Sequence, residues 1–166
     1  ALADAMTITE YNNKQKPKIV LSWAPHPKAL PHAVANSFIK MIKNINAEFI
    51  ITNPDGYDLD PKITKGVKRY SNQVEAFEGA DFIYAKNWCS YQDYGKVLRT
   101  TNEWIINDEK MNYTNNAKFM HCLPIRRNIV ASDQVLDNKN SLVLKQSENR
   151  VYACQAILKQ LIDDHK

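Results

Sequence analysis

Lys18-Ile-Val-Leu-Ser-Trp-Ala24 is a mostly apolar run, rich in branched residues, and it predicts a buried β-strand. Similar runs recur along the chain, separated by amphipathic segments, and they predict strands over 48–52, 81–86, 118–123 and 141–145. Strands that alternate with helices need crossover connections. The pattern therefore predicts an α/β fold, a three-layer, Rossmann-like parallel sheet flanked by helices.

The segments between these runs have helical spacing. Helices are predicted over 2–11, 32–44, 62–70, 72–78 and 107–111. A final helix is expected to begin near a cap at Ser147 or Asn149 and to run to about Asp163. Its inward face is assigned to Val151, Cys154, Ile157, Leu158 and Leu161.

Length and composition are those of an ordinary globular domain. The 166 residues suit one domain with a single core, and 44% hydrophobic and 24% charged residues are a typical balance. Lys and Arg exceed Asp and Glu by only 22 − 18 = 4, without a basic patch, so nucleic acid is not an expected partner. No apolar run approaches the roughly 20 residues that span a bilayer, so no membrane partner is expected. Because the chain lacks an initiator Met and opens in mid-helix, Ala1 is interpreted as a cut point within a longer protein.

Cysteine and glycine usage argues against several kinds of site. Cys89, Cys122 and Cys154 are far apart and lack C-x-x-C spacing, so neither a zinc site nor a disulfide framework is predicted. A reducing, cytoplasmic compartment fits this pattern. The four glycines form no G-x-G-x-x-G or Walker sequence, so no nucleotide loop is predicted, and we expect neither a cofactor nor a metal.

The residues that follow each strand form the candidate site, because ligands of parallel sheets bind beyond the carboxyl ends of the strands. His26 lies between two prolines after the first strand, and Lys86 ends the third. After the fourth, a Leu123–Pro124 bond can be cis and expose backbone carbonyls to a substrate amide. Arg126 and Arg127 can clamp a carboxylate or a phosphate through paired N–H donors.

Each of these residues also has a structural interpretation that the pattern leaves open. Lys86 can be a solvated lysine, His26 a structural histidine, and the two arginines plain surface residues. A nucleophilic pair of His121 and Cys122 is disfavoured, because adjacent strand residues point to opposite faces. Arg150 falls at the predicted start of the last helix, where the helix dipole mildly disfavours a cation, so either a functional purpose or surface placement is open.

Several motifs together resemble the second domain of ornithine carbamoyltransferases. They are His121-Cys-Leu-Pro124, Glu148-Asn-Arg150 and the opening Leu2-Ala-Asp-Ala-Met-Thr-Ile-Thr9, and the resemblance covers essentially all 166 residues. It implies that 1–166 form a single domain, the amino-acid-binding half of a two-domain enzyme whose N-terminal carbamoyl-phosphate domain is absent. It also implies small-molecule substrates and a homotrimer with sites shared between subunits.

A departure from this family sharpens the expected substrate. Where ordinary ornithine carbamoyltransferases carry an aspartate thought to bind the amino-acid end of ornithine, this chain has Lys86. An ammonium repels the free α-amino group of ornithine, whereas it suits the α-carboxylate and the neutral acyl group of an N-acylated ornithine. The segments Trp23–Pro27, Tyr84–Trp88 and His121–Asn128 accordingly resemble the N-acetylornithine and N-succinylornithine transcarbamylases.

This sequence resembles the N-succinylornithine transcarbamylases more closely than the N-acetylornithine transcarbamylases, notably at Ala24-Pro25. Acetyl-specific relatives carry a lysine that can be carboxylated near the position of Val130, which argues against the acetyl branch. By resemblance, the contacts with the acylornithine are made by His26, Lys86, Leu123 and Arg126. Those with carbamoyl phosphate are made by Cys122, Leu123 and Arg150.

The implied reaction is carbamoyl transfer from carbamoyl phosphate to the δ-amine of an N-acylornithine, in arginine biosynthesis. Arg150, Cys122 and Leu123 are the catalytic candidates: Arg150 polarises the carbamoyl oxygen, and the Leu123 carbonyl accepts from the carbamoyl NH2. The alternatives are an ordinary ornithine carbamoyltransferase domain, a nucleotide-binding dehydrogenase domain, and a non-catalytic domain that shares only the fold.

Overall fold

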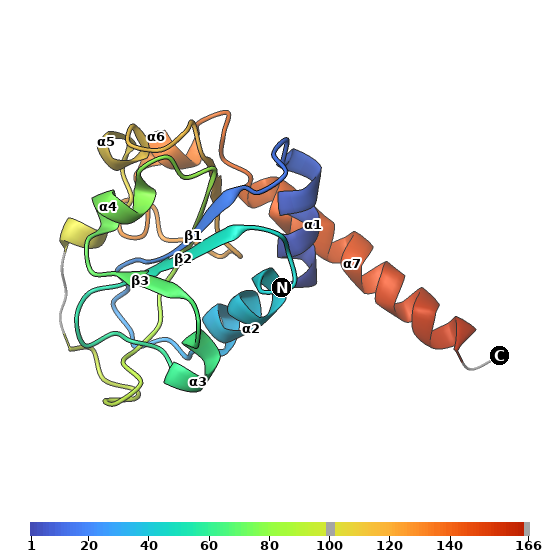
Figure 1. Ribbon diagram of the computed structural model, residues 1–166, viewed down its shortest axis with the longest axis horizontal. Helices are drawn as coiled ribbons and strands as arrows, with labels where there is room; N and C mark the ends of the chain where they lie inside the picture. The colour runs from blue at the N-terminus through green and yellow to red at the C-terminus, as the bar shows by residue number, and fades with distance from the viewer. Residues whose placement is uncertain (99–101, 165–166) are drawn as a thin grey trace.

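A computed structural model describes residues 1–98 and 102–164, and it has the predicted three-layer α/β arrangement (Figure 1). Within these residues one parallel sheet has the strand order β3-β2-β1-β4-β5. Its strands are β1 (Lys18–Trp23), β2 (Glu48–Thr52), β3 (Lys68–Tyr70), β4 (Phe82–Lys86) and β5 (Lys118–Met120). The register pairs Trp23 with Lys86, so the carboxyl ends of β1 and β4 lie side by side.

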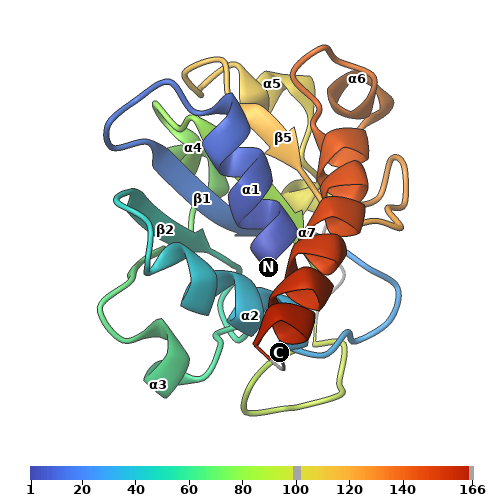
Figure 2. The same cartoon turned by 90° about the vertical axis from the view of Figure 1, so that its right-hand side faces the viewer.

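Helices lie against both faces of this sheet. One face is covered by α1 (Leu2–Tyr11) and α2 (Ala33–Ile42), and α7 (Val143–Asp163) runs beside α1 (Figure 2). The other face is covered by α4 (Gln73–Phe77), α5 (Asp108–Met111) and α6 (Asp133–Leu136). The short helices α3 (Pro61–Thr64) and η1 (Asn102–Trp104) lie in connections. In the described part of the chain, no helix combines the length and apolar character needed to cross a membrane.

Alternation along the strands builds two hydrophobic cores, one on each face. Ile19 and Leu21 of β1 pack with Phe38 of α2, whereas Val20 packs on the opposite side with Phe77 of α4. Since both faces are buried, the central strands are nearly continuous in apolar residues, as expected for a parallel sheet. This rigid sheet fixes the positions of the loops at its carboxyl ends.

The structure differs from the sequence prediction in four elements. The helix predicted over 62–70 is only the single turn α3, followed by the edge strand β3, because Gly66 with φ +79° takes a left-handed conformation between them. The strand predicted over 118–123 ends at Met120. The strand predicted over 141–145 is wrong, since Ser141 makes only an isolated bridge to Phe119 and α7 begins two residues later. The helix α6 was not predicted.

The predicted inward face of the final helix is also wrong. The side chains that α7 buries are Val143, Gln146, Asn149 and Ala153, all in its first half. Its second half projects from the body of the molecule (Figure 1) and does not pack against the rest of the described chain. All five residues assigned inward are exposed, with Val151 at 57% and Leu158 at 59%. The other three are Cys154, Ile157 and Leu161.

Candidate functional site

The carboxyl ends of β1, β4 and β5 bring His26, Lys86 and His121 together. His121 follows β5 and is 3% exposed. Burial is the largest cause that lowers the pKa of its imidazole, and together with smaller electrostatic contributions from Lys86 and His26 it brings the pKa to about 3. Since β1, β4 and β5 are neighbours in one parallel sheet, the residues at or just after their carboxyl ends lie around the same end of the sheet. His121 is therefore neutral at physiological pH.

The loop that follows Lys86 is anchored to the loops beside it. The Asn87 side-chain amide donates to the carbonyl of Ala24 at 2.8 Å, and the Trp23 indole donates to the carbonyl of Trp88 at 2.8 Å. Lys86 itself is half-buried, and within residues 1–98 and 102–164 its ammonium has no hydrogen-bond or ion-pair partner. The loop holds the Lys86 ammonium in place while its N–H groups have no acceptor among the described residues, so this group is suited to bind an anionic ligand.

His26 is also half-buried, on the loop after β1. Its Nδ1 atom accepts from the backbone N–H of Lys28 at 3.1 Å, which fixes the ring against its own loop. The same loop continues to His32, whose Nε2 lies 2.8 Å from the carbonyl of Cys89. The loops after β1 and β4 are therefore tied at several points, and they hold His26 and Lys86 in place.

Cys122 and Leu123 form the turn after β5. The Leu123–Pro124 peptide bond is cis, the isomer that the sequence analysis considered, and Leu123 has φ +45°. The Leu123 N–H donates to Nδ1 of His121 at 3.0 Å. Cys122 is a free, partly buried thiol. The Nδ1 atom of His121 already accepts from Leu123, so this nitrogen is not free to deprotonate Cys122.

The two arginines after this turn have different surroundings. Arg127 donates to Asp133 at 2.6 Å and to Asp137 at 2.5 Å, so it fastens the turn to α6. These bonds raise the pKa of Arg127 and lower the pKa of both carboxyls. Of the two interpretations that the sequence left open for Arg127, a ligand clamp or a surface arginine, the ion pairs favour a structural role. Arg126 is exposed and has no side-chain partner among the described residues, so its guanidinium is available to a ligand.

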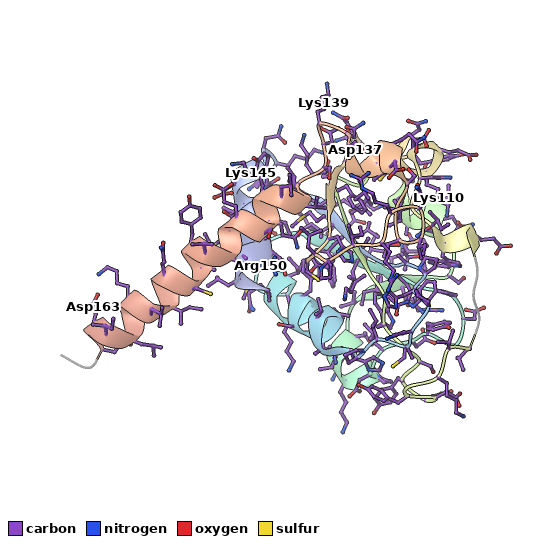
Figure 3. The ribbon with its side chains drawn as sticks, turned by 180° about the vertical axis from the view of Figure 1, so that it is seen from behind. Lys110, Asp137, Lys139, Lys145, Arg150 and Asp163 are labelled. Atoms are coloured by element: carbon purple, nitrogen blue, oxygen red, sulfur yellow. The ribbon has the colours of Figure 1, made fainter. Side chains whose placement is uncertain are left out.

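Arg150 is the eighth residue of α7, not its first turn as predicted, so the helix-dipole argument does not apply to it. Its Nη2 donates to Ser147 Oγ at 2.7 Å. Four residues earlier on the same side of the helix, Gln146 accepts from the backbone N–H of His121 at 2.9 Å. Arg150 thus leaves α7 one turn beyond a residue that contacts the end of β5, and Figure 3 shows it close to the body of the molecule.

Gln146 was missed by the sequence analysis, and His121 was considered only as a partner of Cys122. The hydrogen bond between the His121 N–H and the Gln146 side chain joins residues 25 positions apart, and no local sequence motif indicates it. In the described part of the chain, no three His, Cys, Asp or Glu side chains gather in a group that could hold a metal ion. The arrangement as a whole offers Lys86, His26 and Arg126 as donors near a backbone turn, a combination suited to a small anionic molecule with an amide group.

Comparison with known proteins identifies what this arrangement is similar to. Residues 31–161 match the family model described as the aspartate/ornithine carbamoyltransferase, Asp/Orn binding domain. N-succinylornithine carbamoyltransferase of Bacteroides fragilis (strain 638R) is 46% identical over 99% of this chain and 52% of its own length. N-acetylornithine carbamoyltransferase of Xanthomonas axonopodis pv. citri (strain 306) is 33% identical over 96% of this chain and 53% of its own.

A solved structure has the same fold. It is a single-residue mutant of an N-acetyl-L-ornithine transcarbamylase, complexed with carbamyl phosphate and N-succinyl-L-norvaline. It superposes with a TM-score of 0.88 at 30% identity, and the match covers 95% of this chain and 54% of that one. This chain therefore spans about half the length of the curated relatives and solved structures that it matches.

Proposed function

This chain belongs to the aspartate/ornithine carbamoyltransferase family, and we propose that it forms the amino-acid-binding domain of a longer enzyme. That enzyme transfers the carbamoyl group of carbamoyl phosphate to the δ-amine of an N-acylated ornithine, N-succinylornithine in preference to N-acetylornithine. Residues 1–166 act as one domain, and a second domain supplies most of the contacts with carbamoyl phosphate. The products are an N-acylcitrulline and phosphate, and the pathway is arginine biosynthesis.

The observation that carries this proposal is the partnerless ammonium of Lys86 at the carboxyl end of β4. Lys86 lies beside the neutral His121, and the site also contains His26 and Arg126. A free ornithine would bring its cationic α-amino group toward this ammonium and be repelled. An acylated nitrogen is neutral, so the α-carboxylate and the acyl oxygens remain to be bound by Lys86, His26 and Arg126.

The chemistry proposed for the turn follows from its backbone. The lone pair of the δ-amine attacks the carbamoyl carbon, the bond from that carbon to the bridging phosphate oxygen breaks, and the amine loses a proton. The carbonyl of Leu123 accepts from the carbamoyl NH2, and Cys122 contacts the same group. Arg150 donates to the carbamoyl oxygen as negative charge develops there. The domain contributes mainly by orienting two substrates, which needs no covalent intermediate.

Preference for the succinyl group is supported by two observations. The relatives named for N-succinylornithine are 46% identical to this chain, against 33% for the Xanthomonas axonopodis relative named for N-acetylornithine. Val130, which stands where the acetyl branch is expected to carry a lysine, is 2% exposed and packs in the core beside α6. We also propose that the full-length enzyme is a homotrimer and is located in the cytoplasm.

The test is carbamoyl transfer by the full-length enzyme with three acceptors offered separately: ornithine, N-acetylornithine and N-succinylornithine. We expect kcat/KM to be highest for N-succinylornithine and lowest for ornithine. Preference for N-acetylornithine would reverse the choice of branch. Preference for free ornithine would contradict the charge argument at Lys86, and failure to turn over any of the three would contradict carbamoyl transfer itself.

A further inference from the structure

The turn that carries Cys122 and Leu123 is fastened to α7 and α1 by a chain of hydrogen bonds. The Leu123 N–H donates to Nδ1 of His121 at 3.0 Å, and the His121 N–H donates to Oε1 of Gln146 at 2.9 Å. Nε2 of Gln146 in turn donates to Oδ1 of Asp4 at 2.7 Å. His121, Gln146 and Asp4 are all buried, and Gln146 is only 1% exposed. None of these three side chains has a role in the chemistry described above.

The amide of Gln146 is suited to this place because it both donates and accepts. Its donation to Asp4 fixes which side of the amide faces that carboxylate, so the carbonyl oxygen must face the N–H of His121. Loss of the amide would leave that buried N–H without an acceptor, which is costly in a low-dielectric interior. The end of β5 would then have to shift to find another partner.

We propose that Gln146 is a positioning residue for the carbamoyl site. Through His121 it holds the turn so that the carbonyl of Leu123 stays aimed at the carbamoyl NH2. This inference rests on the proposed carbamoyl transfer and extends it to a residue of α7 that has no substrate contact of its own. His121 transmits the constraint as a neutral ring, because only an unprotonated Nδ1 can accept from the Leu123 N–H.

Asn149 offers a matched comparison on the same helix. It is 4% exposed, and its Nδ2 donates to Oγ1 of Thr7 at 2.9 Å and to Oε2 of Glu10 at 2.8 Å. Both Gln146 and Asn149 are therefore buried amides that join α7 to α1. Of the two, Gln146 also has a bond to the end of β5. Substitution at Asn149 weakens the helix pair and leaves the turn fastened.

The kinetic test uses the full-length enzyme with Gln146→Met, the double variant Asp4→Asn with Gln146→Glu, and Asn149→Leu. We expect Gln146→Met to lower kcat by about ten- to a hundredfold with little change in the KM for N-succinylornithine, because the turn is misplaced by a fraction of an ångström. The double variant keeps an acceptor for His121 and reverses the donor and acceptor between α7 and α1, so it is expected to recover much of kcat. Asn149→Leu is expected to lower Tm at least as much as Gln146→Met, with kcat near wild type. Equal losses of kcat in Gln146→Met and Asn149→Leu, or no recovery in the double variant, would overturn the inference.

A second measurement is independent of turnover. In full-length protein with ¹⁵N-labelled histidine and leucine, we expect NMR to find Nδ1 of His121 unprotonated and the Leu123 amide protected from exchange. In Gln146→Met, exchange of that amide should become faster. A protonated Nδ1, or unchanged exchange, would overturn the relay even if carbamoyl transfer is confirmed. A wild-type enzyme that has this relay but no carbamoyl transfer would instead contradict the proposed function.

Discussion

At the scale of single residues, the charge at the end of β4 is the feature on which the proposed choice of amino acid depends. Lys86 is held in place because its neighbours Asn87 and Trp88 are bonded to the loop after β1 and to Trp23. Its long side chain is half-buried, so an anion bound there is partly shielded from water and interacts more strongly than at an open surface. The proposed selectivity for an acylated substrate therefore rests on one ammonium and on the stiffness of its loop.

Replacement of this ammonium gives the first prediction. In the full-length enzyme, Lys86→Met should lower kcat/KM for N-succinylornithine by about ten- to a hundredfold, since a charge-assisted hydrogen bond contributes about 1.5–3 kcal/mol. Steady-state kinetics measure the loss, and circular dichroism checks the fold. Lys139→Met is the control, because Lys139 is exposed on the connection between α6 and α7 (Figure 3). Similar losses in both variants would remove Lys86 from the site.

The buried imidazole of His121 gives a prediction about pH. Its pKa is about 3 in the folded chain, against about 6.5 when unfolded. Between these values the unfolded chain takes up a proton that the folded chain does not, so the free energy of unfolding falls as the pH falls. The contribution of this residue approaches about 1.4 kcal/mol per pH unit below pH 6.

Urea unfolding of the chain and of His121→Asn at pH 7, 6 and 5 measures this contribution. Asparagine does not titrate, and its side-chain oxygen can still accept from the N–H two residues on. We expect the stability of wild type relative to the variant to drop by about 1–2 kcal/mol between pH 7 and pH 5. A difference that stays constant across this range would show that His121 is not held neutral.

Sequence reasoning found residues that lie directly after strands and missed those that act across the fold. Sequence reasoning could select His26, Lys86 and Arg126 because the loops that follow parallel strands all lie at the carboxyl edge of the sheet. The role of Arg127 could not be decided from the sequence, because its partner Asp133 lies on the short helix α6 and Asp137 directly follows it. The sequence pattern of that one-turn helix was too weak to predict it. Gln146 looked like any polar helical residue, since its bonds depend on how α7 packs against β5 and α1.

At the scale of elements, α7 combines two different faces. One face is fastened to α1 and β5 by buried amides, whereas another exposes an apolar stripe. Leu144, Val151 and Leu158 recur every seven residues and are 75%, 57% and 59% exposed. The sequence analysis included Val151 and Leu158 in an apolar helical face but assigned that face to the interior, because helical period shows that a face is apolar and does not show what covers it.

The stripe gives a prediction for the 166-residue chain in solution. A contiguous exposed apolar face promotes association, so the chain should self-associate at micromolar concentrations. Val151→Glu with Leu158→Glu should shift sedimentation toward the monomer and change Tm by only a few degrees, since neither side chain is in the core. Ala153→Glu is the contrasting variant, because Ala153 is 6% exposed and its replacement should lower Tm substantially. A monomeric wild-type chain would contradict the prediction.

At the scale of the whole molecule, the sheet supplies one wall of a site and the chain spans about half the length of its relatives. The residues after β1, β4 and β5 can bind an amino acid, but within the described chain they include few donors for a doubly charged phosphate. Arg126 and Arg150 are the guanidinium groups near the turn that no carboxylate holds, whereas Arg127 is occupied by α6. Turnover should therefore need the remainder of the enzyme.

This division of roles predicts that the 166-residue chain binds without catalysing. Calorimetric titration should detect weak binding of N-succinylornithine, weaker still in Lys86→Met, while carbamoyl transfer stays below detection. Orientation of both substrates accounts for most of the rate in such a mechanism, and one wall cannot orient two molecules. Addition of the separately expressed other half of a full-length relative should raise turnover above background if the two halves reassociate. Transfer by the 166-residue chain alone would show that it contains a complete carbamoyl-phosphate site, and the assignment of separate roles to two domains would have to be abandoned.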